Sequence, residues 1–230
     1  MAGEPDRQLA LELPFRPAMG REDFIVSESN AAAVDAIDKL ETADPPLLVV
    51  VGPEGSGKTH LGAIFQEQAG AVRADASELS EAVMEQMLSA GAGLVEGMPP
   101  EAGKPFAEDT FFHLINAAIN KRLALLITAR NDPPAWSLKT DDVRTRLRLA
   151  RVVTLAMPDD ALFSALLLKL MADRQITVAA NALRYAIPRL ERSHAAAEAF
   201  VKAVDTASME KRRTVTLGVV REVIAGMNGD

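Results

Sequence analysis

Short apolar runs alternate with amphipathic stretches along the first two thirds of the chain. The apolar runs lie at residues 47–51, 71–74, 94–95, 123–128 and 152–155, and we expect a strand at each. Between the runs, apolar residues recur at helical spacing, as in Leu61, Ile64 and Phe65. Strands that alternate with helices form a parallel sheet with helices on both faces. The pattern therefore predicts an α/β fold with a five-stranded parallel sheet.

The pattern changes on either side of this region. Beyond Pro158 only helical spacing remains, which predicts helices near residues 162–170, 183–190, 195–204 and 217–224. Residues 1–22 lack periodicity and contain three prolines, so we expect an extended arm there. We therefore divide the chain into an arm (1–22), an α/β domain (23–157) and a small helical domain (158–230).

Residues 52–59 read GPEGSGKT and satisfy the phosphate-loop pattern G-x-x-x-x-G-K-[ST]. They lie between a predicted strand and a predicted helix, which is the structural context in which this pattern binds phosphate. The glycines let backbone N–H groups turn toward one anion, and the helix N-terminus adds its positive end. Lys58 can then reach the β- and γ-phosphates, and the Thr59 hydroxyl can ligate Mg²⁺. A chance glycine turn is the alternative interpretation; we expect a nucleoside di- or triphosphate site.

A nucleotide-hydrolysing site of this type also needs an acidic group at a strand end to hold magnesium. The run 94–95 is followed by Glu96 and Gly97, where an acidic pair would be expected. Glu96 is thus the second candidate magnesium ligand beside Thr59, and a plain surface carboxylate is the alternative. Gly97 offers no side chain, so we expect hydrolysis by the isolated chain to be weak or absent.

Charge and composition narrow the function classes. The 230 residues carry a net charge of −7, which argues weakly against autonomous binding to a nucleic-acid backbone. Basic residues still gather at Arg144, Arg146, Arg148 and Arg151, and again at 211–213. Cysteine is absent, which excludes disulfides and thiolate metal sites and fits a reducing cytoplasm. With neither a signal peptide nor a long apolar run, we expect a soluble intracellular protein without a membrane partner.

The remaining candidate residues favour structural roles. His60, His113 and His194 are scattered, and no His/Asp/Glu spacing suggests a metal cage. Trp136, which follows a proline turn, is interpreted as a packing anchor rather than a recognition residue.

Several segments resemble the DnaA family of bacterial replication initiators. Residues 57–61 (GKTHL) resemble its phosphate loop, and residues 23–30 (DFIVSESN) resemble the segment that opens its AAA+ domain and forms part of the adenine pocket. Residues 126–130 (LITAR) resemble its sensor 1 strand. Residues 142–147 (DVRTRL) resemble its arginine-finger segment, and this match places the finger on Arg146. The matches run in the family's order from about residue 22 to the C-terminus.

This resemblance implies the AAA+ P-loop NTPase fold with a C-terminal helical lid. It implies ADP or ATP as the bound nucleotide, with Mg²⁺ on Thr59 and Glu96. The implied nucleotide-binding residues are Ile25, Val26, Pro53, Glu54, Gly55, Ser56, Gly57, Lys58, Thr59 and His60. At the sensor 2 position Ala195 stands in place of an arginine, and Arg192, one helical turn earlier, is the candidate substitute. The loss of this arginine would weaken the coupling of the bound nucleotide to hydrolysis.

The sequence ends at Asp230, directly after the predicted lid, so we expect no DNA-binding helix-turn-helix domain such as DnaA carries. What remains resembles the Hda family of DnaA-related regulators, and most of all its alphaproteobacterial form. That family binds the sliding clamp through an N-terminal motif, which residues 8–15 (QLALELPF) resemble. An extended peptide with alternate side chains in pockets suits such recognition. The implied clamp-binding residues are Gln8, Leu9, Leu11, Leu13, Pro14 and Phe15.

The implied function is the regulatory inactivation of DnaA. A nucleotide, with ADP favoured, holds the core and lid together while the arm docks on the DNA-loaded clamp, the β subunit of polymerase III. Arg146 then acts in trans on ATP held by DnaA, an effect worth ~10³–10⁵ in rate in other systems. This places the protein in the cytoplasm, at the nucleoid and replisome, with DNA contacted through the clamp. Three alternatives stay open: a self-sufficient helicase-loader-like ATPase, a nucleic-acid-binding module, and a clamp-tethered adaptor without effect on hydrolysis. Homo-oligomerisation also stays open.

Overall fold

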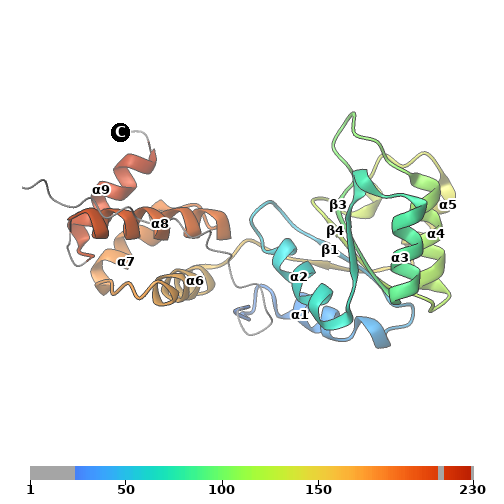
Figure 1. The fold of residues 1–230 in the computed structure, drawn as a ribbon, viewed down its shortest axis with the longest axis horizontal. Helices are drawn as coiled ribbons and strands as arrows, with labels where there is room; N and C mark the ends of the chain where they lie inside the picture. Colours follow the sequence, from blue (N-terminus) through green and yellow to red (C-terminus); the bar gives the residue numbers. More distant parts are fainter. Residues whose placement is uncertain (1–23, 212–214, 229–230) are drawn as a thin grey trace, which may run out of the picture.

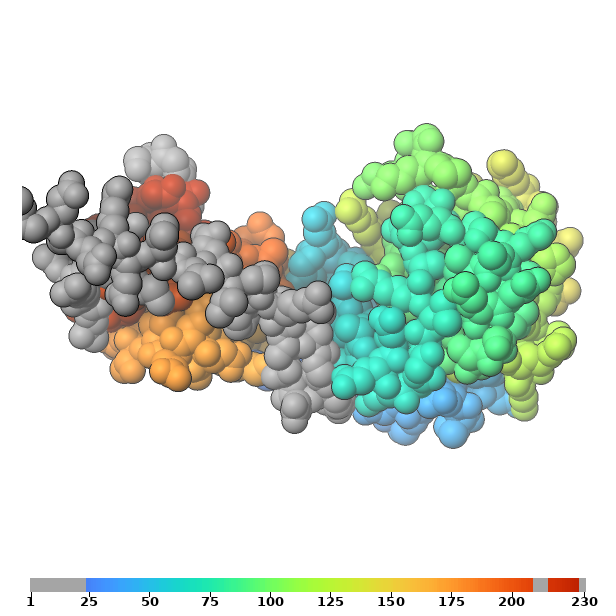
Figure 2. Space-filling view, in the orientation of Figure 1, coloured from blue at the N-terminus to red at the C-terminus, as the bar shows by residue number. Residues whose placement is uncertain are grey.

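A computed structural model describes residues 24–211 and 215–228 of the 230-residue chain. The N-terminal arm with residues 8–15, and most of the basic cluster 211–213, lie outside the described residues. The described part consists of an α/β lobe and a helical lobe (Figures 1 and 2). In the ribbon view the two lobes are joined by a narrower waist (Figure 1). Within the described part, none of the helices is long and apolar enough to cross a bilayer.

The α/β lobe is built on a five-stranded sheet in the order β2-β3-β4-β1-β5. All neighbouring strands pair in parallel, which confirms the predicted sheet. The strands are β1 (Leu47–Val51), β2 (Val72–Asp75), β3 (Ala92–Met98), β4 (Ala124–Ala129) and β5 (Arg151–Thr154). β3 is longer than the run predicted at 94–95. The prediction missed its ends because Gly93, Glu96 and Gly97 interrupt the apolar run.

Helices cover both faces of the sheet, as the alternating pattern predicts (Figure 1). Along β1, Leu47, Val49 and Val51 face one core and Leu48 and Val50 face the other, because side chains alternate along a strand. The second core is closed by helices α1 (Ala31–Asp38) and α2 (Lys58–Ala69). The first is closed by α3 (Glu81–Ala90), α4 (Glu108–Ile119) and α5 (Asp141–Leu147). Short 3₁₀ turns, η2 (Leu40–Thr42), η3 (Ala76–Glu78) and η4 (Pro133–Ala135), complete the lobe.

Two local features of this lobe bear on the sequence-based expectations. Trp136 is 3% exposed, and its indole N–H donates to the Asn131 carbonyl at 2.8 Å, so it packs in the core as predicted. Helix α5 was not among the predicted helices. Its seven residues bury only Val143 and Leu147, too few apolar positions to establish a helical period.

The helical lobe has a hydrophobic core of its own. Its elements are α6 (Asp160–Asp173), α7 (Ala180–Ala186), η5 (Ile187–Arg189), α8 (His194–Lys211) and α9 (Leu217–Asn228). Phe163 and Leu167 from α6 pack with Phe200 from α8 and Val220 from α9, and all four side chains are fully buried. The C-terminal helical lid expected from the sequence is therefore present.

Candidate functional site

The phosphate loop joins β1 to α2 at the carboxyl end of the sheet. Gly57 precedes α2 with a φ of 100°, a left-handed conformation that favours glycine, and α2 begins at Lys58. The Lys58 ammonium donates to the carbonyl oxygens of Gly52 and Pro53, both at 2.7 Å. Burial, and then the nearby Arg130 charge, lower the pKa of Lys58. The lysine is thus held above its own loop, where an anion at the helix N-terminus would meet it.

A cavity of about 510 Å³ opens over this loop. It is lined by residues 54–55 and 57–60 of the phosphate loop and α2, and by the ends of β2 and β3. Residues 128–130 at the end of β4 and the first turns of α8 in the lid complete the lining. Gly55, Lys58 and Thr59, three of the residues predicted to bind nucleotide, line the cavity. Parallel α/β sheets place ligand sites at such carboxyl ends, because the loops there leave a crevice.

Glu96 also lines this cavity, and its residue is only 9% exposed. Its carboxylate forms an ion pair with Arg73, whose Nε contacts Glu96 Oε2 from the neighbouring strand β2. Burial raises the pKa of Glu96 above its ordinary value, although the Arg73 guanidinium opposes that shift. The carboxylate expected to help hold magnesium is therefore already engaged by a cation of the chain itself.

A second carboxylate lies beside the position where Gly97 provides none. Gly97 has a φ of 75°, and a Cβ built there would lie 3.1 Å from Asp75 Oδ2. The other oxygen, Asp75 Oδ1, accepts hydrogen bonds from the backbone N–H and hydroxyl of Ser77, which lower the pKa of Asp75. Arg73 and Asp75 both line the cavity, yet neither was expected from the sequence. No motif marks them, because their place depends on β2 pairing with β3.

The residues that could hold magnesium are few. Thr59 and Glu96 line the same cavity, as expected, but Glu96 is paired with Arg73. Among the described residues, no group of three or more histidine, aspartate or glutamate side chains could hold a metal ion. The expectation of Mg²⁺ on Thr59 and Glu96 stays a prediction, and this donor set fits the ion poorly.

A smaller hollow of about 50 Å³ lies on the other side of the phosphate loop. Phe24, Ile25 and His60 line it together with Leu162 and Leu166 of α6. The Asn30 amide donates to the Ile25 carbonyl at 2.9 Å and accepts from the Ser27 N–H at 2.9 Å, which fixes the turn that presents Ile25. Val26, the other residue expected in the adenine pocket, does not line this hollow and is 47% exposed.

The core and the lid meet at the phosphate loop. A Cβ built on Gly55, whose φ is 78°, would lie 2.4 Å from the Ser193 Cβ of the lid. The ring of His60 on α2 lies between those of Phe24, at 5.0 Å, and His194 on α8, at 6.1 Å. Two histidines that are scattered in the sequence therefore meet at this junction, and His113 packs elsewhere, against Phe112.

The sensor 2 position supplies no cation to the cavity. Ala195, the residue at that position, lines the cavity wall. Arg192 is directed to α6 instead, where its Nε donates to Asp160 Oδ1 at 2.7 Å. In this structure the candidate substitute for the missing arginine is thus held away from the phosphate loop.

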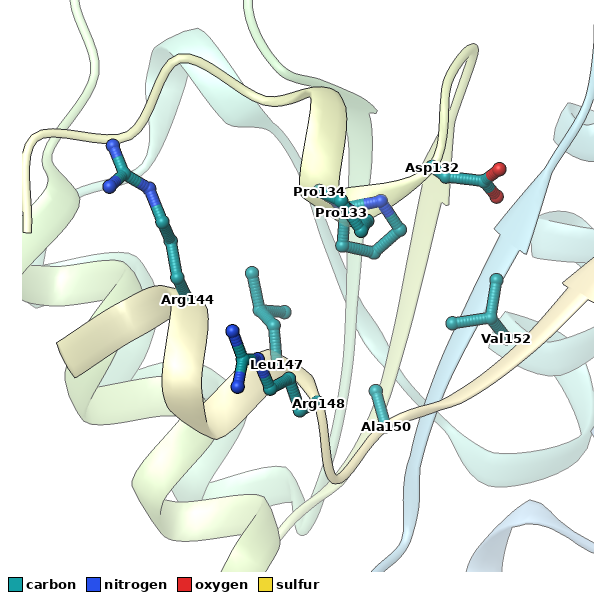
Figure 3. Close-up of a pocket in the computed structure, with 8 residues that line it drawn as sticks. All are labelled: Asp132, Pro133, Pro134, Arg144, Leu147, Arg148, Ala150 and Val152. Atoms are coloured by element: carbon teal, nitrogen blue, oxygen red, sulfur yellow. The ribbon is translucent and has the colours of Figure 1, made fainter. Parts of the chain in front are cut away.

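The arginines of the 144–148 segment separate to different sides of α5. The Arg146 guanidinium carbon lies 5.1 Å from the centre of the Phe112 ring, and Arg146 is not among the residues that line the cavity over the phosphate loop. Arg144 pairs with Asp141 at 2.6 Å. Figure 3 shows Arg144 and Arg148 around a separate cavity of about 460 Å³, whose apolar wall includes Pro133 and Leu147. Arg146 is therefore placed apart from this chain's own phosphate loop.

No protein-family model matches the chain. Domain III of the Thermotoga maritima replication initiation protein DnaA superposes with a TM-score of 0.74 at 17% identity, over 92% of this chain and 97% of that one. AMPPCP-bound DnaA from Aquifex aeolicus gives 0.71 at 17% identity, over 85% and 67%. The Thermotoga maritima RuvB Holliday junction branch migration motor gives 0.72 at 15% identity, over 93% and 73%. Such similarity establishes the fold, and the chain has the AAA+ fold.

Proposed function

We propose that this protein is a DnaA-related AAA+ regulator that binds adenine nucleotide, docks on the DNA-loaded sliding clamp and stimulates hydrolysis of ATP held by DnaA. One observation carries the proposal: the chain has a phosphate-loop cavity, while Arg146 lies outside it. An arginine that is remote from its own nucleotide is available to a partner's nucleotide. The protein would act in the cytoplasm, at the replisome.

Nucleotide binding is supported by three features of the loop. Lys58 is held over the N-terminus of α2, the cavity has room for phosphates, and the hollow lined by Ile25 lies next to the loop. The similar DnaA from Aquifex aeolicus was solved with AMPPCP bound. We infer that ADP is the resting nucleotide, because Ala195 offers no charge to a γ-phosphate and Arg192 is paired with Asp160.

Weak intrinsic hydrolysis is supported by the same cavity. Gly97 has no side chain, Ala195 has no charge, and Arg192 is paired with Asp160. The Glu96 carboxylate, which would be the remaining acidic group of β3, is paired with Arg73. A site with these properties holds a nucleotide without turning it over.

Action on a partner is supported by how α5 presents Arg146. The side chain is half-buried against Phe112, so its orientation is restrained before any partner arrives. A preorganised arginine stabilises charge that develops on a transferred phosphoryl group.

Clamp docking is proposed from the sequence of residues 8–15, which lie outside the described residues.

The test is a reconstituted assay with ATP-bound DnaA, DNA-loaded clamp and this protein. We expect stimulated hydrolysis with the natural chain and with Arg148→Ala, a matched control on the same segment. We expect the stimulation to be lost with Arg146→Ala. Full stimulation by Arg146→Ala would show that the finger assignment is wrong. A clamp pull-down with Gln8→Ala/Leu11→Ala tests the arm separately, and unchanged clamp binding there would reduce the proposal to a DnaA-like nucleotide-binding protein.

A self-sufficient ATPase is the second candidate, and one observation favours it. Asp75 Oδ2 lies 3.1 Å from a Cβ built on Gly97, so β2 supplies the second carboxylate that residue 97 does not. This alternative predicts steady turnover by the isolated chain, which Asp75→Asn would abolish. The main proposal predicts no appreciable turnover without DnaA.

A further inference from the structure

Arg73 lines the cavity and is paired with Glu96, the carboxylate predicted to help hold magnesium. It is on β2, in register with Leu94 of β3, and its side chain reaches diagonally to Glu96 two residues further along. The Glu96 side chain is 11% exposed, whereas that of Arg73 is 47% exposed. The carboxylate is therefore buried behind the guanidinium, and the guanidinium faces the open cavity together with Lys58 and Thr59.

The other cations of this cavity, Lys58 and Arg130, have partners other than Glu96. Lys58 donates to two loop carbonyls, and Arg130 lies 3.3 Å from Glu54 at the outer end of the loop. Arg73 lines the cavity from β2 and is paired with the Glu96 carboxylate of β3. A guanidinium has five N–H donors in a planar fork, so it can hold a carboxylate and a phosphate oxygen at the same time.

We propose that Arg73 links Glu96 to the terminal phosphate of the bound nucleotide in place of a divalent metal ion, so that this chain binds nucleotide without magnesium. The inference rests on the proposed nucleotide-binding function. It departs from the magnesium site that the sequence predicts at Thr59 and Glu96.

Charge repulsion explains why Glu96 does not pair with Arg73 and bind Mg²⁺ at the same time. Mg²⁺ is usually held by one or two carboxylates with water and substrate phosphates, in a near-ideal octahedron. The carboxylate of Glu96 is in direct contact with a guanidinium, and a dication at the same oxygen would be repelled by that charge. Asp75 offers a single oxygen, Oδ2, because its Oδ1 is held by Ser77. The fixed arginine thus supplies the countercharge that a phosphate group requires.

The experiment measures the affinity of the full-length protein for a fluorescent ADP analogue, once in excess EDTA and once in excess MgCl₂. We expect the Kd of the natural chain to differ by less than about threefold between the two buffers. Arg73→Gln should bind at least about tenfold more weakly in EDTA, because one charged contact is lost. It should recover most of that loss in MgCl₂, because Glu96 is then free to accept the ion.

Two further variants keep the result interpretable. Arg130→Gln removes a cation of the same cavity that pairs with Glu54, so it should weaken binding equally in both buffers. Arg73→Lys keeps the charge and should lose less affinity in EDTA than Arg73→Gln. Thermal unfolding of each variant checks that it folds. If Arg73→Gln does not fold, the affinities of Arg73→Lys and the natural chain in EDTA and in MgCl₂ are compared instead.

The inference is overturned if the natural chain loses more than about tenfold in affinity when magnesium is removed. It is also overturned if Arg73→Gln depends on magnesium no more than the natural chain does. A folded natural chain that binds no nucleotide in either buffer would instead refute the proposed nucleotide-binding function, and this inference with it.

Discussion

The Glu108 carboxylate accepts two hydrogen bonds from Thr140, one from the backbone N–H at 2.8 Å and one from the hydroxyl at 2.7 Å. A third comes from the Lys139 N–H at 2.9 Å. Glu108 is the first residue of α4, and Thr140 immediately precedes α5, which carries Arg146. One buried carboxylate therefore accepts the backbone donors of the two residues before α5 and ties the start of that helix to α4, whose Phe112 contacts the Arg146 side chain.

Replacing Glu108 with alanine should destabilise the protein. The change removes the acceptor of the Lys139 and Thr140 backbone N–H groups just before α5, and each hydrogen bond of this kind contributes about 0.5–1.5 kcal/mol. We expect Glu108→Ala to unfold at a lower urea concentration than the natural chain. Unfolding is monitored by the fluorescence of Trp136, the single tryptophan. Glu101→Ala is the control, because Glu101 forms an exposed pair with Lys104, and such pairs contribute little. Equal midpoints for the two variants would contradict this role of Glu108.

The same carboxylate should make stability depend on pH in the acid range. Burial raises the pKa of Glu108, but the hydrogen bonds from Lys139 and Thr140 outweigh burial, so the pKa lies below its ordinary value. A depressed pKa means that the folded state binds the proton less readily than the unfolded state. Its contribution is therefore present above the unfolded pKa, about 4.3, and is lost as the pH falls through the folded value.

The measurement is the free energy of unfolding as a function of pH, from neutral pH down to the lowest pH at which the protein is still folded. We expect the natural chain to lose stability more steeply below about pH 4.3 than Glu108→Gln, which cannot titrate at that position. Parallel curves would show that Glu108 does not contribute to the acid sensitivity. Glu101→Gln, which changes an exposed carboxyl, should follow the natural chain.

Much of the fold follows from local patterns, since strands such as 47–51 and 123–128 are continuous apolar runs and the phosphate loop is a local motif. The site residues that the sequence did not reveal depend on pairing between distant segments. Arg73 and Asp75 enter the cavity because β2 lies next to β3, and nothing near them in the sequence indicates that neighbour. His60 and His194 meet only because the lid packs on the loop. Strand order and lid placement are tertiary properties, so a one-dimensional pattern does not contain them.

The contact between Gly55 and Ser193 should couple the lid to the phosphate loop. Gly55→Ala combines a strained φ of 78° with a Cβ placed 2.4 Å from the Ser193 Cβ, so either the loop or the lid must move. We expect a lower melting temperature and weaker nucleotide binding. Gly70→Ala is the matched control, because Gly70 has a similar φ of 62° but nothing within 4 Å of the added atom. Gly70→Ala should lose stability only through backbone strain, by about 1 kcal/mol or slightly more. If the two variants lose stability equally and bind nucleotide equally, the lid contact is unimportant.

Restoring a cation at the sensor 2 position should change nucleotide preference. Ala195 lines the cavity wall in the first turn of α8, so an arginine there would reach toward the terminal phosphate. We expect Ala195→Arg to bind a slowly hydrolysed ATP analogue about fivefold or more tightly than the natural chain does, with a smaller gain for ADP, because the added charge meets the γ-phosphate. Ala199→Arg, one turn further along the same helix and outside the lining of the cavity, is the control and should leave both affinities unchanged. Equal gains for both nucleotides, or equal gains for both variants, would mean that the arginine acts through general charge and that Ala195 does not face the γ-phosphate position.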